Sequence, residues 1–118
     1  MGVLDRLKSV ASNLVVMPIG IKQQFYRYMP FIVYGGVKYT QIRHAIQCKR
    51  CLETIESKDI HDLKYCSCGA VGIDGGISEG NRILGNLADV EERSVYCANV
   101  GNKKLWLPHS VVEAQIQK

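Results

Sequence analysis

The stretch Cys48-Lys-Arg-Cys51 is followed by Cys66-Ser-Cys68-Gly69, and these two short segments hold four of the five cysteines in the chain. A CxxC pair lets two sulfurs face one point from a single turn. Residues two apart in an extended segment also share a face, so the second pair can aim at the same point. Structural zinc sites need four such ligands converging on a tetrahedron. The spacing therefore predicts a zinc site formed by Cys48, Cys51, Cys66 and Cys68.

Other uses of these cysteines remain open at the level of sequence. Three of them could bind zinc together with His61 or His44, and an iron–sulfur cluster is a further alternative. Disulfides are less favoured, because five cysteines cannot all pair and no secretory signal is recognised at Met1. We therefore expect a cytoplasmic protein in a reducing compartment.

The segments around the cysteines have the composition of short strands. We expect strands at residues 43–47, 53–57, 63–65 and 70–73, which together form a small β module around the metal. A unit of fewer than about 40 residues buries little apolar surface, so the metal would supply much of its stability.

The N-terminal part is predicted to be helical before it becomes a hairpin. Residues 3–16 have an amphipathic helical pattern, suited to packing on the domain itself or on a partner, and residues 21–29 suggest a second helix that ends at Pro30. The runs 31–34 and 37–42 flank Gly35-Gly36 and predict a hairpin.

The C-terminal part is predicted to form turns, a hairpin and a helix. Residues 74–89 are rich in Gly and Asn and lack a phosphate-binding motif, which favours turns. The runs 93–100 and 103–107 flank Gly101-Asn102 as a hairpin, with Cys97 as a buried free thiol and Trp106 in the core. Ser110-Val-Val-Glu113 reads as a capping box opening a short helix.

These elements together predict an α+β fold: N-terminal helices, then short antiparallel strands and a zinc-ribbon-like β module. Two parts are expected. Residues 1–45 form a helical and hairpin segment, and residues 46–118 form the zinc-ribbon-like module with the C-terminal hairpin and helix.

The charge is distributed unevenly along the 118 residues. Residues 1–50 carry eight Lys and Arg against one Asp, a net charge of +7, whereas residues 51–118 carry seven against ten acidic residues, a net charge of −3. Such asymmetry suggests a basic surface for an acidic partner, most commonly nucleic acid, although the two halves could also fold against each other. No apolar run approaches the length of a membrane span.

Aromatic and basic residues are interleaved in the basic half, as is typical of surfaces that bind single-stranded nucleic acid. The candidate contacts are Arg27, Tyr28, Lys38, Tyr39 and Arg43. The alternative is that the tyrosines are half-buried residues of strands and helices.

Several short motifs between residues 46 and 94 resemble a family of uncharacterised small zinc-ribbon-like proteins common in phages and prophages. They are Cys48-x-x-Cys51, Ile55-Glu56-Ser57, His61-Asp62, Cys66-x-Cys68-Gly69, Asp74-Gly75-Gly76, Arg82 and Gly85-Asn86. Where the family has a second basic residue after Arg82, this chain has Ile83. The resemblance implies metal binding and a phage source, and implies no reaction.

Three functions follow from these patterns. The first is a zinc-binding module that contacts nucleic acid or the machinery that processes it. The second is an adaptor or inhibitor of a host protein, with no role for nucleic acid. The third is an enzyme that uses a polar cluster for acid–base chemistry, formed by His61, Asp62, Asp74 and Arg82. This function is less favoured, because a metal with four cysteine ligands has no open position for catalysis. The oligomeric state is not predicted.

Overall fold

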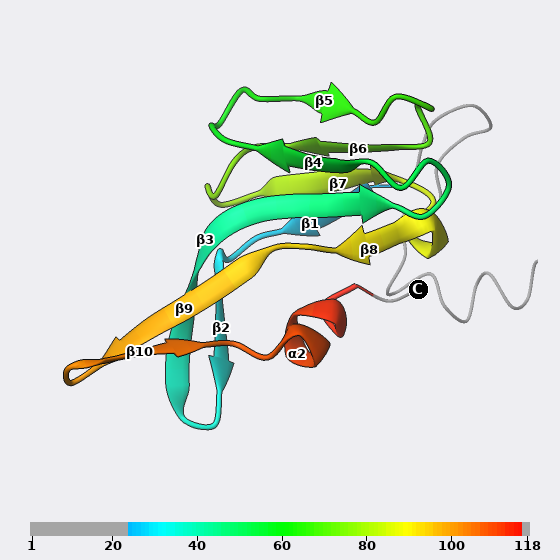
Figure 1. Ribbon diagram of the computed structural model, residues 1–118. Helices are drawn as coiled ribbons and strands as arrows, with labels where there is room; N and C mark the ends of the chain where they lie inside the picture. Colours follow the sequence, from blue (N-terminus) through cyan, green and yellow to red (C-terminus); the bar gives the residue numbers. More distant parts are fainter. Residues whose placement is uncertain (1–23, 117–118) are drawn as a thin grey trace, which may run out of the picture.

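The computed structural model describes residues 24–116, and this part of the chain is built mainly from antiparallel strands (Figure 1). The first half contains β1 (Gln24–Arg27), β2 (Phe31–Tyr34), β3 (Val37–Cys48), β4 (Thr54–Ser57), β5 (Lys64–Tyr65) and β6 (Val71–Asp74). The second half contains β7 (Asn81–Gly85), the 3-10 turn η1 (Leu87–Asp89), β8 (Val90–Glu92), β9 (Val95–Val100), β10 (Lys103–Trp106) and α2 (His109–Glu113).

The strands form two sheets. The smaller sheet has the order β1-β7-β6-β5. In the larger sheet β3 is central: one end pairs in the order β10-β9-β3-β2, and the other end pairs with β4 and β8. The long strand β3 therefore joins the part of the fold that carries the cysteines to the part formed by the two hairpins, as its course through Figure 1 shows. It also runs without a break across the boundary predicted between residues 45 and 46.

Two groups of buried apolar side chains lie along β3. The first includes Ile46 and Cys48 of β3 and packs them against residues of β6 and β7, such as Ile73 and Ile83. The second packs Tyr39 of β3 against its neighbours in the sheet and against Val112 of α2. Helix α2 thus covers one face of the sheet β10-β9-β3-β2.

The prediction of an α+β fold with N-terminal helices is wrong, because the described residues form a β-rich fold. The helix predicted at 21–29 conflicts with β1, whose residues pair with β7 in register from Gln24 opposite Leu84 to Arg27 opposite Asn81. A strand partner far along the chain overrides the weak helical pattern of this short segment. The helix predicted at 3–16 lies outside the described residues.

The hairpins and the strands around the cysteines are confirmed. Residues of β2 pair with β3 around Gly35-Gly36, and residues of β10 pair with β9 around Gly101-Asn102. The strands predicted near residues 43–47, 53–57, 63–65 and 70–73 correspond to the second half of β3 and to β4, β5 and β6. Cys97 is buried and free, as expected.

Other details of the C-terminal half differ from the predictions. Residues 81–85 of the expected turn region form β7. Gly85 has a φ of 112°, and a Cβ there would overlap the carbonyl oxygen of Ala70, so the glycine serves close strand packing. The short terminal helix is present, but Pro108 stands at its N-cap without a side-chain cap, and the Glu113 carboxylate accepts a hydrogen bond from the Glu92 amide at 3.0 Å. The capping box is therefore wrong.

No helix among residues 24–116 is long and apolar enough to cross a membrane.

Candidate metal centre and open sheet face

The four clustered cysteines lie on two turns that face each other. Cys48 ends β3 and Cys51 lies in the turn to β4, whereas Cys66 and Cys68 lie in the turn between β5 and β6. The residue after each pair has a left-handed backbone: Leu52 has a φ of 65° and Gly69 a φ of 75°. Their amides bond back to the carbonyls of Cys48 and Cys66 at 2.8 and 2.9 Å, which closes both turns. Each turn thus ends in a left-handed residue whose amide closes it, although only one of these two residues is a glycine.

The sulfurs are spaced as a tetrahedral metal site requires. All four lie within 4.8 Å of one another, and Cys68 Sγ lies 3.7 Å from Cys48 Sγ and 3.5 Å from Cys66 Sγ. Zinc–sulfur bonds of about 2.3 Å in a tetrahedron place sulfurs about 3.8 Å apart. The four side chains therefore fit a zinc ion. Neither His44 nor His61 belongs to this group, since the His44 ring bonds to the carbonyls of Asp74 and Arg82 instead.

Backbone hydrogen bonds reach the sulfurs of the cluster. The Arg50 amide lies 3.3 Å from Cys48 Sγ. A hydrogen bond from the Glu53 backbone is the main reason that the pKa of Cys51 is lowered to about 6. Burial opposes ionisation of Cys66, but hydrogen bonds from the Val71 backbone and neighbouring thiols outweigh it and lower its pKa.

Cys68 behaves differently within the same cluster. The Ala70 backbone favours its thiolate, but the adjacent Cys66 thiol and burial outweigh this and raise the pKa of Cys68 to about 11. Four thiols so close together cannot all ionise without a cation. A divalent cation would remove that repulsion and deprotonate the remaining thiol.

The basic residues near the cysteines have carboxylate partners of their own. Lys49 lies 3.5 Å from Glu91, and Arg50 lies 3.1 Å from Asp89. Lys64 pairs with Asp62 at 3.2 Å. Their charges are therefore shared with acidic residues and are not reserved for the thiolates.

The four polar residues considered for catalysis have structural contacts. Asp74 pairs with Arg82 at 3.0 Å across β6 and β7. Asp62 accepts a hydrogen bond from the Lys58 amide at 2.8 Å, within the turn that follows β4. Within residues 24–116, no hydrogen bond or ion pair joins the exposed His61 ring to Asp62, Asp74 or Arg82. The structure therefore does not assemble these four side chains into one cluster.

The five residues predicted to bind nucleic acid are divided between the interior and the surface. Arg27 is only 4% exposed and pairs with the fully buried Glu92 at 3.1 Å. Tyr39 is buried in the second core group. Tyr28 is 72% exposed in the turn after β1. Lys38 and Arg43 lie on β3, on the face of the sheet opposite α2.

The face of the sheet β10-β9-β3-β2 opposite α2 carries an aromatic and basic set of side chains. Directly opposed residues share a face, and the register places Phe31, Thr40, Cys97 and Trp106 in one row across the four strands. Lys38 and Lys104 lie two residues along from Thr40 and Trp106 and share their face. A register shift after Gln41 sets Arg43 opposite Val95. Val95 shares a face with Cys97, so Arg43 lies on the same face as Lys38 and Thr40. We call this surface the open face, defined by Phe31, Lys38, Thr40, Arg43, Val95, Cys97, Lys104 and Trp106.

The rings and cations of the open face contact one another. Lys38 Nζ lies 4.2 Å from the centre of the Phe31 ring, and Lys104 Nζ lies 5.3 Å from that of Trp106. Trp106 is 56% exposed, so its predicted place in the core is wrong. Strand pairing explains the difference, because the Trp106 side chain points away from the face that α2 covers.

Residues 31–43 and 95–106, which form this end of the sheet, contain no Asp or Glu. Arg43 does pair with Glu56 of β4 at 3.2 Å, but within the described residues Lys38 and Lys104 have no carboxylate partner. The open face is therefore positively charged.

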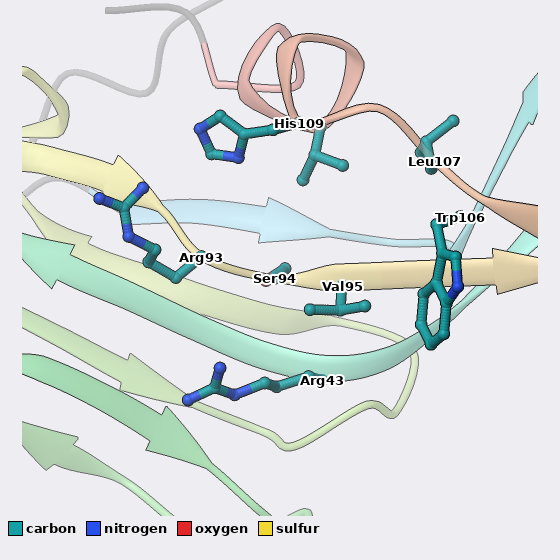
Figure 2. A pocket seen from close by; sticks show the side chains of 8 residues that line it. Arg43, Arg93, Ser94, Val95, Trp106, Leu107 and His109 are labelled. Carbon is teal, nitrogen blue, oxygen red and sulfur yellow. The ribbon is translucent and has the colours of Figure 1, made fainter.

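A hollow of about 310 Å³ lies at the end of the open face, beyond the last residue of β10. Figure 2 shows Trp106, Val95 and Arg43 on one side of β9, with Leu107 and His109 on the side of α2. The hollow continues the surface past the Trp106 ring.

Phe31, Lys104 and Trp106 were not identified as binding candidates from the sequence. One signal was available: Lys103-Lys104-Leu105-Trp106 alternates in a hairpin strand, and neither hairpin contains an acidic residue. The adjacency of the two hairpins, which creates the open face, depends on tertiary pairing.

Residues 35–85 match a family described as a domain of unknown function, DUF7695. The matched segment contains all four clustered cysteines. No curated protein and no solved structure shows significant similarity to the chain. The expected resemblance to an uncharacterised family is thus confirmed, whereas the zinc-ribbon and phage attributions stay predictions.

Proposed function

We propose that this protein is a zinc-stabilised β domain that binds nucleic acid through the open face. The observation that carries the proposal is the open face itself: exposed Lys38 and Lys104 each lie over an aromatic ring, on strands without acidic residues. Nucleic-acid-binding surfaces combine cations for phosphates with aromatic rings for bases.

Zinc has a structural role in this proposal. Four cysteine ligands leave no open coordination position, so the ion would cross-link the two turns and would not take part in a reaction. By holding the end of β3, the site would fix the strand that also carries Lys38 and Arg43. The phage source implied by the resemblance would place the protein in the host cytoplasm.

The metal part of the proposal is tested by elemental analysis. We expect one zinc per chain, with loss of zinc in Cys66→Ser and retention in Cys97→Ser, because Cys97 lies outside the cluster. A folded protein purified without metal would contradict a structural zinc site.

The nucleic-acid part is tested by the salt dependence of binding. Each cation that neutralises a phosphate of a single strand contributes about −0.7 to the slope of log K against log salt concentration. Replacing Lys38, Arg43 and Lys104 together with alanine should reduce the slope by about 2. The control is Lys103→Ala, next to Lys104 on the opposite face of β10.

The competing function is the adaptor or inhibitor of a host protein. It expects no binding to DNA or RNA even at low salt, where electrostatic attraction is least screened. That result, together with a discrete complex with one protein, would overturn the nucleic-acid proposal.

A further inference from the structure

We infer that the ligand of the open face is a single-stranded nucleic acid that lies across the strands, with bases stacked on Trp106 and Phe31. This inference rests on the proposed function and adds the form of the nucleic acid and its path. It follows from the position of the two rings and of their neighbouring cations.

Phe31 and Trp106 lie at the two ends of one row. The row crosses β2, β3, β9 and β10, with Thr40 and Cys97 between the two aromatic residues. Three spacings between neighbouring strands of about 4.8 Å separate the rings by about 14 Å. Stacked nucleotides are about 3.4 Å apart along the axis, so at most about five nucleotides span the two rings. An unstacked, more extended strand would need fewer.

Side chains between the rings are small enough to let a strand pass. Thr40 is short, and Cys97 is buried within the sheet surface. The larger groups of the row are the two rings themselves, of which Trp106 is exposed and Phe31 is half-buried. A chain of nucleotides can therefore run from one ring to the other.

Each ring has one cation in position for a phosphate. Lys38 and Lys104 lie in the neighbouring row, and the pairings Val33 with Lys38 and Lys104 with Asn99 place both on the open face. An exposed ammonium group above a ring is held only weakly, and base–aromatic stacking is stronger. A base can thus displace the lysine from the ring, and the freed lysine can contact the adjacent phosphate.

A double helix does not fit this arrangement. Its bases are paired and stacked internally, so neither ring can reach the face of a base without opening the duplex. The hollow beyond Trp106 supplies a further contact for a single strand, because Arg43 lines it next to Val95 (Figure 2).

The test measures the anisotropy of fluorescein-labelled oligo-dT of two, three, five and eight nucleotides, with a labelled hairpin duplex for comparison. We expect affinity to rise steeply up to about five nucleotides and little beyond, and the duplex to bind at least about tenfold more weakly. Trp106 is the only tryptophan in the chain, so quenching of its fluorescence by unlabelled oligo-dT reports stacking directly.

Matched variants separate stacking from general attraction. Trp106→Ala should weaken binding of five nucleotides by roughly 5- to 150-fold, and Trp106→Phe should restore part of the affinity because a ring remains. Tyr34→Ala is the control, since Tyr34 is exposed and pairs with Val37 on the face that packs against the second core group. Lys104→Ala should weaken binding more than Lys103→Ala.

The outcomes distinguish this inference from the proposed function. The inference of a stacked single strand would be overturned if duplex and single strand bound equally well, or if Trp106→Ala and Tyr34→Ala had equal affinities. Either result would leave the proposed nucleic-acid binding in place. Absence of binding to every oligonucleotide at low salt would overturn both.

Discussion

Leu52 is the one non-glycine residue with a positive φ among residues 24–116. Its φ of 65° closes the first cysteine turn in the way that Gly69 closes the second. A left-handed backbone costs a residue with a Cβ about 1–2 kcal/mol, and glycine is largely free of this cost. The first turn therefore holds strain that the second turn lacks.

Leu52→Gly should stabilise the protein by up to about 1 kcal/mol, because the strain is relieved and the exposed side chain contributes little packing. Denaturant unfolding measures the change. Leu63→Gly is the control: Leu63 is also exposed but lacks a positive φ, so its replacement should destabilise. A loss of stability in Leu52→Gly equal to that in the control would contradict the account.

His44 links stability to pH. Burial, together with the nearby Arg27 guanidinium, lowers the pKa of His44 from 6.5 to about 4. The ring nitrogen Nε2 lies 3.1 and 3.2 Å from the carbonyls of Asp74 and Arg82, so it carries a proton and donates to them. The neutral ring therefore fits this site and a second proton does not.

Stability should fall as the pH drops from 6.5 towards 4, since the unfolded chain takes up a proton that the folded protein excludes. The contribution is present above pH 6.5 and amounts to about 3 kcal/mol at most. His44→Gln retains an N–H donor but cannot titrate, so the stability difference between the two proteins should shrink over this range. Acid release of zinc is common to both and cancels. A constant difference would refute the assignment.

At the scale of elements, the buried pair between Arg27 and Glu92 joins β1 to β8. Their side chains are 4% and 0% exposed, and Glu92 also accepts a hydrogen bond from the Ser94 amide at 3.2 Å. The stability of each buried charge depends on the other, because removing one side chain leaves the other charge unpaired in a low-dielectric interior. The pair thus restricts how the two sheets can be arranged.

Arg27→Met should destabilise by about 3–5 kcal/mol, because the Glu92 carboxylate loses its partner. Adding Glu92→Leu should recover part of that loss, so the double variant should be more stable than Arg27→Met alone in denaturant unfolding. The partly exposed pair of Lys64 and Asp62 provides the control, and Lys64→Met should cost about 1 kcal/mol or less. Additive effects of the two buried substitutions would rule out the coupling.

Local signals predicted those elements whose pairing is local. The hairpins around Gly35-Gly36 and Gly101-Asn102, and the cysteine turns, are encoded by neighbouring residues and were found. Strand β1 was mistaken for a helix because its partner β7 lies more than 50 positions along the chain. Strand β7 was predicted as turns because it begins with Asn81 and ends with Gly85. The Asn81 side chain instead donates buried hydrogen bonds to Gln41 and to the Gly76 carbonyl, and Gly85 allows close strand packing.

At the scale of the whole molecule, the metal ligands and the open face differ in how they arise. Ligand spacing is a property of two short segments, so the four cysteines could be identified from the sequence. The open face needs two hairpins side by side, and the shift after Gln41 that directs Arg43 outward has no local signature. Arg27 and Tyr39 were accordingly assigned to a surface although both are buried.

The long strand β3 should couple the metal site to the open face. Its end supplies Cys48 to the metal site, Ile46 packs in the first core group, and Tyr39 packs in the second. Removing zinc with a strong chelator should therefore release more than the two cysteine turns, because the strand that carries Lys38 and Arg43 loses its anchored end.

Structural zinc contributes on the order of 10–16 kcal/mol in small zinc-dependent domains, which is comparable to the whole stability of a domain. We expect Trp106 fluorescence, which reports the far end of the sheet, to change in one transition that coincides with the loss of β signal in circular dichroism. Cys97→Ser serves as the control that keeps all four ligands and should behave as the parent protein. A chelated protein whose Trp106 environment stays unchanged while the β signal falls would show that the two ends of β3 unfold independently.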